Sequence, residues 1–486
     1  MSENARNGAC ARLSAAISVR TVSYDNLTNL APGPIDVPDP VRAPLEDFHV
    51  LLEKAFPRVH SNLERTVVNR YSLLFKWSGT YPGGPGNEPM VLMAHQDVVP
   101  ALPDTIDQWT HDPFAGYIDL DLGRIWGRGA SDCKSTLMGQ LEAVEALLAA
   151  GFTPSRDIYL AYGSDEEISG HQGAKYIAEH METKLGLTGK IGLIVDEGSA
   201  FEMFLGVPVA NVAVTERGYV DVGVTVETKG GHSSVPPPHT GIGYTALLIS
   251  AIEDAEYESS LSDENPLLQY VKCYVGHADN PDKELTRAVA RLNKGGRKVL
   301  VDRLSHLSNE WHSLLTTTQA VDVITGGLKV NALPEKVTTL INHRISVDSS
   351  LAETQKHLLR AIVPVAKKHR LDLPTNGKVT VAPNFGYGLE PSPVSPSIGS
   401  GVRAWDILEG TIHAVYDPVY HEKVVVSPGM MTGNTDTRWY HNLSTNIYRF
   451  APARGTNIHT VDEYVTIDDY VNAIKFYETL IRNWSA

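Results

Sequence analysis

Residues 90–100 read MVLMAHQDVVP, and this stretch decides the fold class. Its first five residues form a short apolar run, which is typical of a buried strand. The polar residues His95, Gln96 and Asp97 follow directly. In open α/β sheets, binding sites form in the loops at the carboxyl ends of the strands. The stretch therefore predicts a buried strand that delivers an imidazole and a carboxylate to such a site.

Two further apolar runs lie downstream, at residues 157–162 (DIYLAY) and 191–195 (IGLIV). Segments with helical periodicity, at residues 135–150 and 173–185, separate the three runs. Strands that alternate with helices indicate an α/β domain, in which helices flank the sheet. We expect the loops after the three strands to converge on one place.

Acidic side chains are concentrated in these loops and in the turn-rich segment before residue 135. The candidate metal ligands are His95, Asp132, Glu166 or Glu167, and Asp196. Zinc binds imidazole and carboxylate groups where cysteine is not offered, and a catalytic metal pair needs a carboxylate to bridge it. The residues alone leave open whether Glu166 or Glu167 binds metal while the other acts as the base on the attacking water. Asp97 is suited to orienting the imidazole of His95 through a hydrogen bond.

Composition argues against several other classes of protein. The chain of 486 residues has a net charge of -15 and no stripe of Lys and Arg, so we expect no nucleic-acid partner. The three cysteines are too few for a disulfide framework, and Cys133, beside Asp132, is expected to point away and pack. No apolar stretch approaches the roughly 18–20 residues of a membrane helix. The N-terminus does not resemble a secretory signal. We therefore expect a cytoplasmic protein with no membrane partner.

The pattern of apolar and polar residues in the sequence changes near Thr215. Residues 219–226 (YVDVGVTV) alternate strictly between apolar and other residues, as in a strand with one wet face. Residues 241–315 look mainly helical and polar. Further strands are expected at residues 321–325, 337–345 and 379–381. We predict a catalytic domain made of residues 1–214 and 384–486, with an inserted α+β domain at residues 215–383.

Eight sequence blocks, spread over nearly the whole chain, occur in the same order in one known family. They are MAHQDVVP (93–100), WGRGASDCKS (126–135), GSDEEISG (163–170), IVDEG (194–198), GGHSSVPP (230–237), KVNALPE (329–335), TGNTDTRWY (432–440) and NIHTVDEYV (457–465). The chain resembles the M20 metallopeptidases, and among them the carboxypeptidase S (Gly-Xaa carboxypeptidase) group and related N-acyl-amino-acid hydrolases. The resemblance implies a zinc-dependent exopeptidase-type domain, with a mixed sheet flanked by helices, and an inserted lid or dimerisation-type domain.

The resemblance also implies two Zn²⁺ per chain, for which Co²⁺ or Mn²⁺ could substitute. His95 and Asp196 would hold one ion and Glu167 and His459 the other, with Asp132 bridging them. Glu166 would be the general base. His459 rests on the resemblance alone, because its surroundings read as a loop.

Three further roles follow from the resemblance. His232 would stabilise the oxyanion of the tetrahedral intermediate, and Asn331 and Arg438 would bind the free carboxylate of the substrate. The expected reaction is hydrolysis of the amide bond next to a C-terminal carboxylate, by a carboxypeptidase or dipeptidase. The alternatives are an N-acyl-amino-acid amidohydrolase (aminoacylase) with the same mechanism and, from another class, a non-catalytic binding relative. The substrate would be a small peptide or an N-acyl amino acid. A homodimer through the inserted domain is a further expectation.

Overall fold

In the computed structural model, the apolar run at residue 90 becomes strand β3 (Met90–His95), and all six of its residues are buried. β3 runs parallel to β6 (Ile158–Gly163) on one side and to β7 (Leu193–Asp196) on the other. The three strands lie in a nine-stranded sheet with the order β1-β2-β6-β3-β7-β17-β9-β16, and β8 pairs with β9. The loops after β3, β6 and β7 therefore open at one edge of the sheet, as predicted.

The remaining strands complete a mixed sheet. They are β1 (Glu64–Val68), β2 (Ser72–Trp77), β8 (Phe201–Phe204), β9 (Val207–Glu216), β16 (Val425–Met431) and β17 (Ile447–Arg449). β2 is antiparallel to β6, whereas β17 is parallel to β7. A mixed sheet flanked by helices confirms the predicted fold class.

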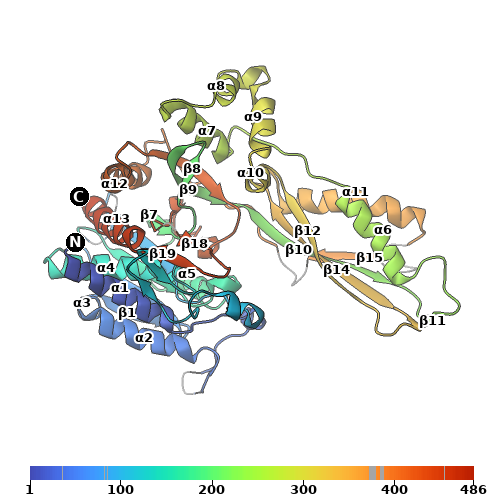
Figure 1. Cartoon of the computed structure of the whole chain (residues 1–486), viewed down its shortest axis with the longest axis horizontal. Coiled ribbons are helices and arrows are strands. Elements are labelled where there is room, and N and C mark those ends of the chain that lie inside the picture. Colours follow the sequence, from blue (N-terminus) through green and yellow to red (C-terminus); the bar gives the residue numbers. More distant parts are fainter. Residues whose placement is uncertain (35–36, 82, 85, 372–378, 384–387, 454) are drawn as a thin grey trace. The chain divides into compact units, whose positions relative to one another are not determined.

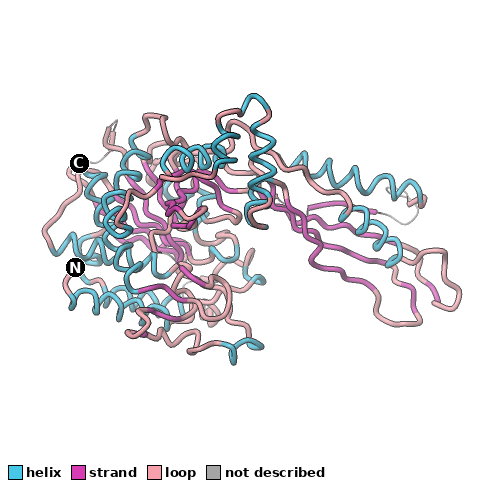
Figure 2. Tube along the Cα trace, turned by 45° about the horizontal axis from the view of Figure 1, so that its top comes forward, coloured by secondary structure: helices cyan, strands magenta, loops and turns pink. Residues whose placement is uncertain are grey.

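Helices cover both faces of this sheet (Figure 2). Alternate residues of its strands are therefore buried in two separate cores. Leu92 of β3 belongs to the larger core, and Val91 and Met93 belong to the smaller one. The larger core contains side chains of α1 (Glu3–Ser18), α2 (Ala43–Ala55), α3 (Pro57–Asn62), α4 (Lys134–Ala149), α12 (Arg403–Tyr420) and α13 (Ile467–Ser485). The smaller core contains side chains of α5 (Ala174–Thr183). The strands are thus buried on both faces, so the loops at their ends are the parts that can carry the residues of a site.

A second, smaller sheet lies within the same part of the chain. It has the order β18-β19-β5-β4, with β18 (Gly455–Thr456), β19 (Tyr464–Thr466), β5 (Arg124–Trp126) and β4 (Ile118–Asp119). Tyr464 of β19 pairs with Trp126 of β5. The pairing holds the loop between β18 and β19 beside the turn that follows β5.

The residues from Thr215 onward build a separate antiparallel sheet with the order β12-β14-β10-β15. Its strands are β12 (Thr318–Gly326), β14 (Lys336–Ile345), β10 (Gly218–Glu227) and β15 (Val379–Pro383). Side chains of α6 (Gly241–Glu253) and α11 (Leu351–Lys368) pack in one core with β10 and β14. This part also contains the short strands β11 (Gly231–His232) and β13 (Ala332–Leu333), and the helices α7 (Pro266–His277), α8 (Lys283–Val289), α9 (Gly296–Ser305) and α10 (Asn309–Leu315).

The structure describes residues 1–34, 37–81, 83–84, 86–371, 379–383, 388–453 and 455–486, which form two units (Figure 1). The first unit comprises Met1–Val214, Ser395–Gly429 and Thr435–Ala486, and the second comprises Thr215–Val394 and Met430–Asn434. The predicted return to the catalytic domain at residue 384 lies outside the described residues. Among the residues described, no helix combines the length and apolar character needed to cross a bilayer.

Candidate metal centre

Asp132 lies between two histidines in the first unit. Its Oδ1 is 3.0 Å from Nε2 of His95, and its Oδ2 is 3.1 Å from Nε2 of His459. His95 ends β3, Asp132 lies in the turn between β5 and α4, and His459 lies in the loop between β18 and β19. A carboxylate whose two oxygens face different imidazoles has the arrangement that a bridge between two metals requires.

Among the described residues, two groups of side chains place their ligand atoms close enough to hold a metal ion. The first group is His95, Asp132, Cys133 and Glu197, and the second is Asp132, Glu167 and His459. Within each group, the ligand atoms lie within 4.8 Å of one another. Asp132 belongs to both groups, and Oε2 of Glu167 is 3.1 Å from Nε2 of His459. Imidazole nitrogens and carboxylate oxygens are donors that suit zinc.

The side chains of the adjacent residues Asp196 and Glu197 make different contacts at the end of β7. Glu197 places Oε1 3.2 Å from Nε2 of His95. Asp196 belongs to neither group, and its Oδ1 accepts a hydrogen bond from the backbone N–H of Glu197. Glu197 was not among the ligands predicted from the sequence, and the assignment of Asp196 stays a prediction. The available signal was that two acidic residues stand next to each other at a strand end, as they do at Glu166 and Glu167.

Cys133 does not point away from the centre. Its Sγ accepts a hydrogen bond from the backbone N–H of His95 at 3.1 Å, and the side chain is buried. Burial raises the pKa of the Cys133 thiol well above its usual value. In the absence of metal the thiol is therefore protonated, and its sulfur serves as a hydrogen-bond acceptor within the group around His95.

Asp97 holds the turn that carries the two glutamates. Its Oδ1 accepts from the backbone N–H of Glu166 at 3.0 Å, and its Oδ2 from that of Glu167 at 3.2 Å. The hydroxyl of Ser23 also donates to Oδ2. Nδ1 of His95 is 2.9 Å from the backbone carbonyl of Asp97 and 3.4 Å from its carboxylate. These acceptors favour a proton on Nδ1, which leaves Nε2 free to bind metal.

Carboxylates are crowded in this part of the molecule. Burial raises the pKa of Glu197 to about 8, and it also raises the pKa of Glu166 and of Glu167. Hydrogen bonds to Asp132 and Glu167 raise the pKa of His459 to about 10. Carboxylates that are buried together resist full ionisation unless cations compensate their charge. The site therefore fits divalent metal ions.

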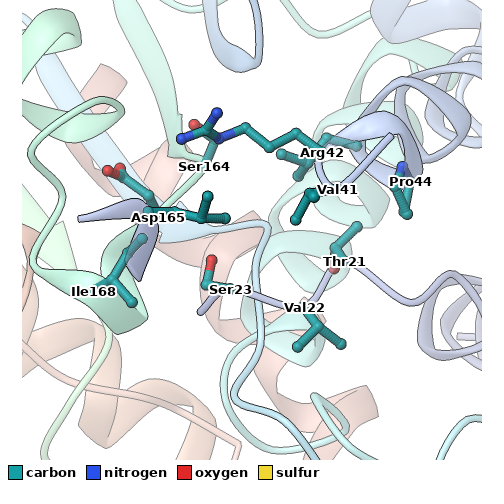
Figure 3. A pocket seen from close by; sticks show the side chains of 11 residues that line it. Thr21, Val22, Ser23, Val41, Arg42, Pro44, Ser164, Asp165 and Ile168 are labelled. Atoms are coloured by element: carbon teal, nitrogen blue, oxygen red, sulfur yellow. The ribbon is translucent and has the colours of Figure 1, made fainter. Parts of the chain in front are cut away.

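A small cavity lies behind the turn that carries the glutamates, and its lining includes Ser23, Arg42 and Asp165 (Figure 3). Its volume is about 10 Å³, which is room for about one water molecule. Asp165 accepts a hydrogen bond from the backbone N–H of Gln172, and burial raises the pKa of Asp165 to about 7. The cavity is too small for an amino acid, so it is not a substrate pocket.

The other predicted site residues are divided between the two units. His232 and Asn331 lie in the second unit, where both are exposed and where β11 pairs with β13. The backbone carbonyl of Asn331 accepts from the N–H of Ser233, and Nδ1 of His232 is 2.7 Å from the hydroxyl of Ser234. Arg438 lies in the first unit, and its Nε donates to the carbonyl of Thr435.

Comparison with known proteins identifies the family of this chain. The family model described as peptidase family M20/M25/M40 matches residues 91–483. Carboxypeptidase S of Saccharomyces cerevisiae is 38% identical over 499 residues, which cover 98% of this chain and 84% of that protein. The N-fatty-acyl-amino acid synthase/hydrolase PM20D1 of Bos taurus is 32% identical over 486 residues, which cover 97% of this chain and 86% of that protein.

Solved structures share the fold. The M20 family metallo-carboxypeptidase Sso-CP2 from Sulfolobus solfataricus matches with a TM-score of 0.65 at 19% identity, over 100% of both chains. Human carnosine dipeptidase 1 matches with a TM-score of 0.64 at 14% identity, over 99% of this chain and 96% of that one. The resemblance seen in the eight sequence blocks is thereby confirmed. The match over residues 91–483 and the identity to carboxypeptidase S show that this chain belongs to the M20/M25/M40 family of metallopeptidases.

Proposed function

We propose that this chain is a zinc-dependent exopeptidase that hydrolyses the amide bond next to a free C-terminal carboxylate and releases an amino acid. The observation that carries the proposal is the position of Asp132 between His95 and His459, beside the turn that bears Glu166. The relatives named as carboxypeptidases support the substrate class.

Two Zn²⁺ per chain are part of the proposal, with Co²⁺ or Mn²⁺ as substitutes. Asp132, Glu167 and His459 would hold one ion, and His95, Asp132 and a residue at the end of β7 would hold the other. The geometry favours Glu197 over Asp196 for that last position, because only Glu197 belongs to the group around His95. Bound zinc would polarise the scissile carbonyl and make water more acidic.

Glu166 is proposed as the general base. Its backbone is fixed by Asp97, and its carboxylate is not a member of either ligand group. Burial raises the pKa of Glu166 well above its usual value, which makes the carboxylate a stronger base. Glu166 would take the proton from the attacking water and then give it to the leaving nitrogen.

The second unit is proposed to act as a lid. His232 would stabilise the oxyanion, and Asn331 and Arg438 would bind the substrate carboxylate. The guanidinium group of Arg438 matches a carboxylate through two parallel hydrogen bonds.

A homodimer through the second unit is a further part of the proposal. β12 is an edge strand of its sheet, and the apolar side chains of Val323, Ile324, Leu328 and Val330 are exposed on it and just beyond it. Unpaired edge strands can pair with a second copy. Analytical ultracentrifugation would test this, and a monomer at micromolar concentration would contradict it.

The second candidate function is an N-acyl-amino-acid amidohydrolase, which the relative named as an N-fatty-acyl-amino acid synthase/hydrolase favours. The chemistry is the same, and only the acyl side of the substrate differs. Release of leucine from Gly-Leu and from a fatty-acyl leucine would separate the two candidates. Faster release of leucine from the fatty-acyl leucine would favour the amidohydrolase over the peptidase as the function of this chain. A chain purified without metal and inactive on both substrates would indicate the non-catalytic alternative.

A further inference from the structure

Glu463 is a fully buried carboxylate in the first unit that is not among the proposed metal ligands. It lies four residues after His459 in the sequence. Its Oε1 accepts three backbone hydrogen bonds, from the N–H groups of Gly129 (3.0 Å), Ser131 (2.8 Å) and Asp132 (3.1 Å). Its Oε2 forms an ion pair with Nη1 of Arg128 at 2.5 Å. All of these partners belong to the turn that carries the proposed bridging ligand.

The turn depends on this carboxylate for its shape. Gly127 and Gly129 have φ values of 142° and 87°, a conformation that glycine adopts readily and other residues rarely do. The three backbone N–H groups of the turn converge on one oxygen atom of Glu463. Without that acceptor, buried donors would lose their partner, and the backbone would have to move to satisfy them.

The loop that carries His459 is also held in an unfavourable conformation. Asn457, His459 and Asp462 have φ values of 59°, 61° and 59°, which are uncommon for residues other than glycine. Such conformations persist where the surroundings impose them. The contacts that do so include the two hydrogen bonds from Thr110 to the carboxylate of Asp462.

The two segments are in direct contact through their backbones as well. The N–H of Gly127 donates to the carbonyl of Glu463, and Nη2 of Arg128 donates to the carbonyl of Thr460. A Cβ atom added to Gly455 would lie only 1.5 Å from Oγ of Ser131. The loop and the turn are therefore packed together closely, and Glu463 is the side chain that joins them.

We propose that Glu463 is a positioning residue that fixes the turn of Asp132 against the loop of His459, so that both can bind the same metal ion. The inference rests on the proposed function, since it takes Asp132 and His459 as ligands. Glu463 acts through these two residues and touches no reacting atom. Groups that orient metal ligands in this way typically change metal affinity by about 10–100-fold when they are removed.

The competing explanation is that Glu463 and Arg128 form a purely structural ion pair. Arg12 and Glu142 provide a matched control within the same unit. Nε and Nη2 of Arg12 donate to the two carboxylate oxygens of Glu142 at 2.6 and 2.7 Å, and neither residue belongs to a ligand group. Glu142→Ala should therefore lower stability without changing the metal centre.

The experiment compares wild type, Glu463→Ala, Glu463→Gln and Glu142→Ala. Zinc affinity is measured by competition with a chromophoric chelator, turnover by release of leucine from Gly-Leu and from a fatty-acyl leucine, and site geometry by the absorption spectrum of the Co²⁺-loaded protein. We expect Glu463→Ala to bind one of its two zinc ions about 10–100-fold more weakly. Its kcat should fall at least tenfold with little change in KM, its Co²⁺ spectrum should change, and excess zinc should restore part of the activity.

Glu463→Gln should lie between wild type and Glu463→Ala, because an amide oxygen can still accept from the three N–H groups while the ion pair with Arg128 is lost. It also serves as the test if Glu463→Ala does not fold. Wild-type zinc affinity, kcat and Co²⁺ spectrum in the Glu463 variants, with a loss of thermal stability like that of Glu142→Ala, would overturn the inference. Failure of wild type itself to bind two metal ions would instead overturn the proposed function.

Discussion

At the residue scale, the proposed metal centre includes two pairs of adjacent acidic residues, and the two members of each pair make different contacts. Glu166 and Glu167 follow β6, and Asp196 and Glu197 stand at the end of β7. Neighbouring residues leave the backbone in different directions, so one member of each pair can reach a metal while the other does not. In each pair, the second member belongs to a ligand group.

The first pair leads to a test of the proposed base. Glu166→Gln keeps the shape of the side chain but cannot accept a proton from water. We expect the variant to retain its zinc, as measured by elemental analysis, while kcat falls by about 10²–10⁴-fold. The matched variant Glu167→Gln should lose metal as well as activity. Near-normal turnover by Glu166→Gln would refute its assignment as the base.

The second pair gives a direct comparison of two neighbouring residues. Glu197 is 3.2 Å from His95, whereas Asp196 accepts the N–H of Glu197. We therefore expect Glu197→Gln to weaken zinc binding by at least tenfold, and Asp196→Asn to weaken it less. Isothermal titration of the metal-free variants with zinc measures both affinities. The reverse order would restore Asp196 as the ligand.

The limits of sequence reasoning are clear at this scale. The candidates that could be proposed from the sequence each lie at or near the end of an apolar run or beside a turn. They are His95, Asp132, the Glu166/Glu167 pair and Asp196. His459 could not be found this way, because its loop is brought to the centre by strand pairing between β19 and β5. The choice between Asp196 and Glu197 depends on where β7 ends, and a shift of one residue reverses the direction of a side chain.

At the element scale, long apolar or strictly alternating runs could be predicted well. The structure has strands at β3, β6, β7, β10 and β14 where such runs occur. Helix α1 was not predicted, because its buried face, Ala9, Cys10, Leu13, Ala16 and Ile17, includes small residues that contrast weakly with their neighbours. The short strands β18 and β19 were also missed, since their stability comes from pairing and not from local sequence.

Strand β14 leads to a prediction about pH. His343 of β14 is fully buried, and burial lowers its pKa from 6.5 to about 4. Between these values the unfolded chain binds a proton that the native His343 does not, so stability falls as the pH drops from about 6.5 to 4. The loss is about 3 kcal/mol at most. His343→Phe should remove this part of the pH dependence in urea unfolding curves, while substitution of the exposed His306 by Gln should leave it. If the free energy of unfolding fell equally steeply with decreasing pH in wild type and His343→Phe, the prediction would be contradicted.

At the scale of the whole molecule, the ligand groups all belong to the first unit, whereas His232 and Asn331 belong to the second. Metal binding should therefore stabilise one unit selectively. A ligand present at a thousandfold excess over its Kd stabilises the state that binds it by about 4 kcal/mol, which corresponds to roughly 6 °C in a unit of about 300 residues.

Metal removal tests this expectation. Dialysis against a chelator should lower the melting temperature of the first unit by roughly 6 °C. The second unit, followed through the fluorescence of its Trp311 in a variant whose other tryptophans are replaced by Phe, should melt at an unchanged temperature. Added zinc should restore the original transition, and added magnesium should not. Equal shifts in both units would show that the metal is not confined to the first.

The small sheet that joins β5 to β19 also has a consequence for synthesis of the protein. Arg128 and Glu463 are 335 residues apart in the chain, and Tyr464 must be present before it can pair with Trp126. A nascent chain on the ribosome therefore carries His95, Asp132 and Glu167 long before His459 and the strand beside it emerge. On the proposed ligand assignment, the position shared by Glu167 and His459 can be completed only after β18 and β19 have been made, so a nascent chain that stops short of these strands should have no hydrolytic activity.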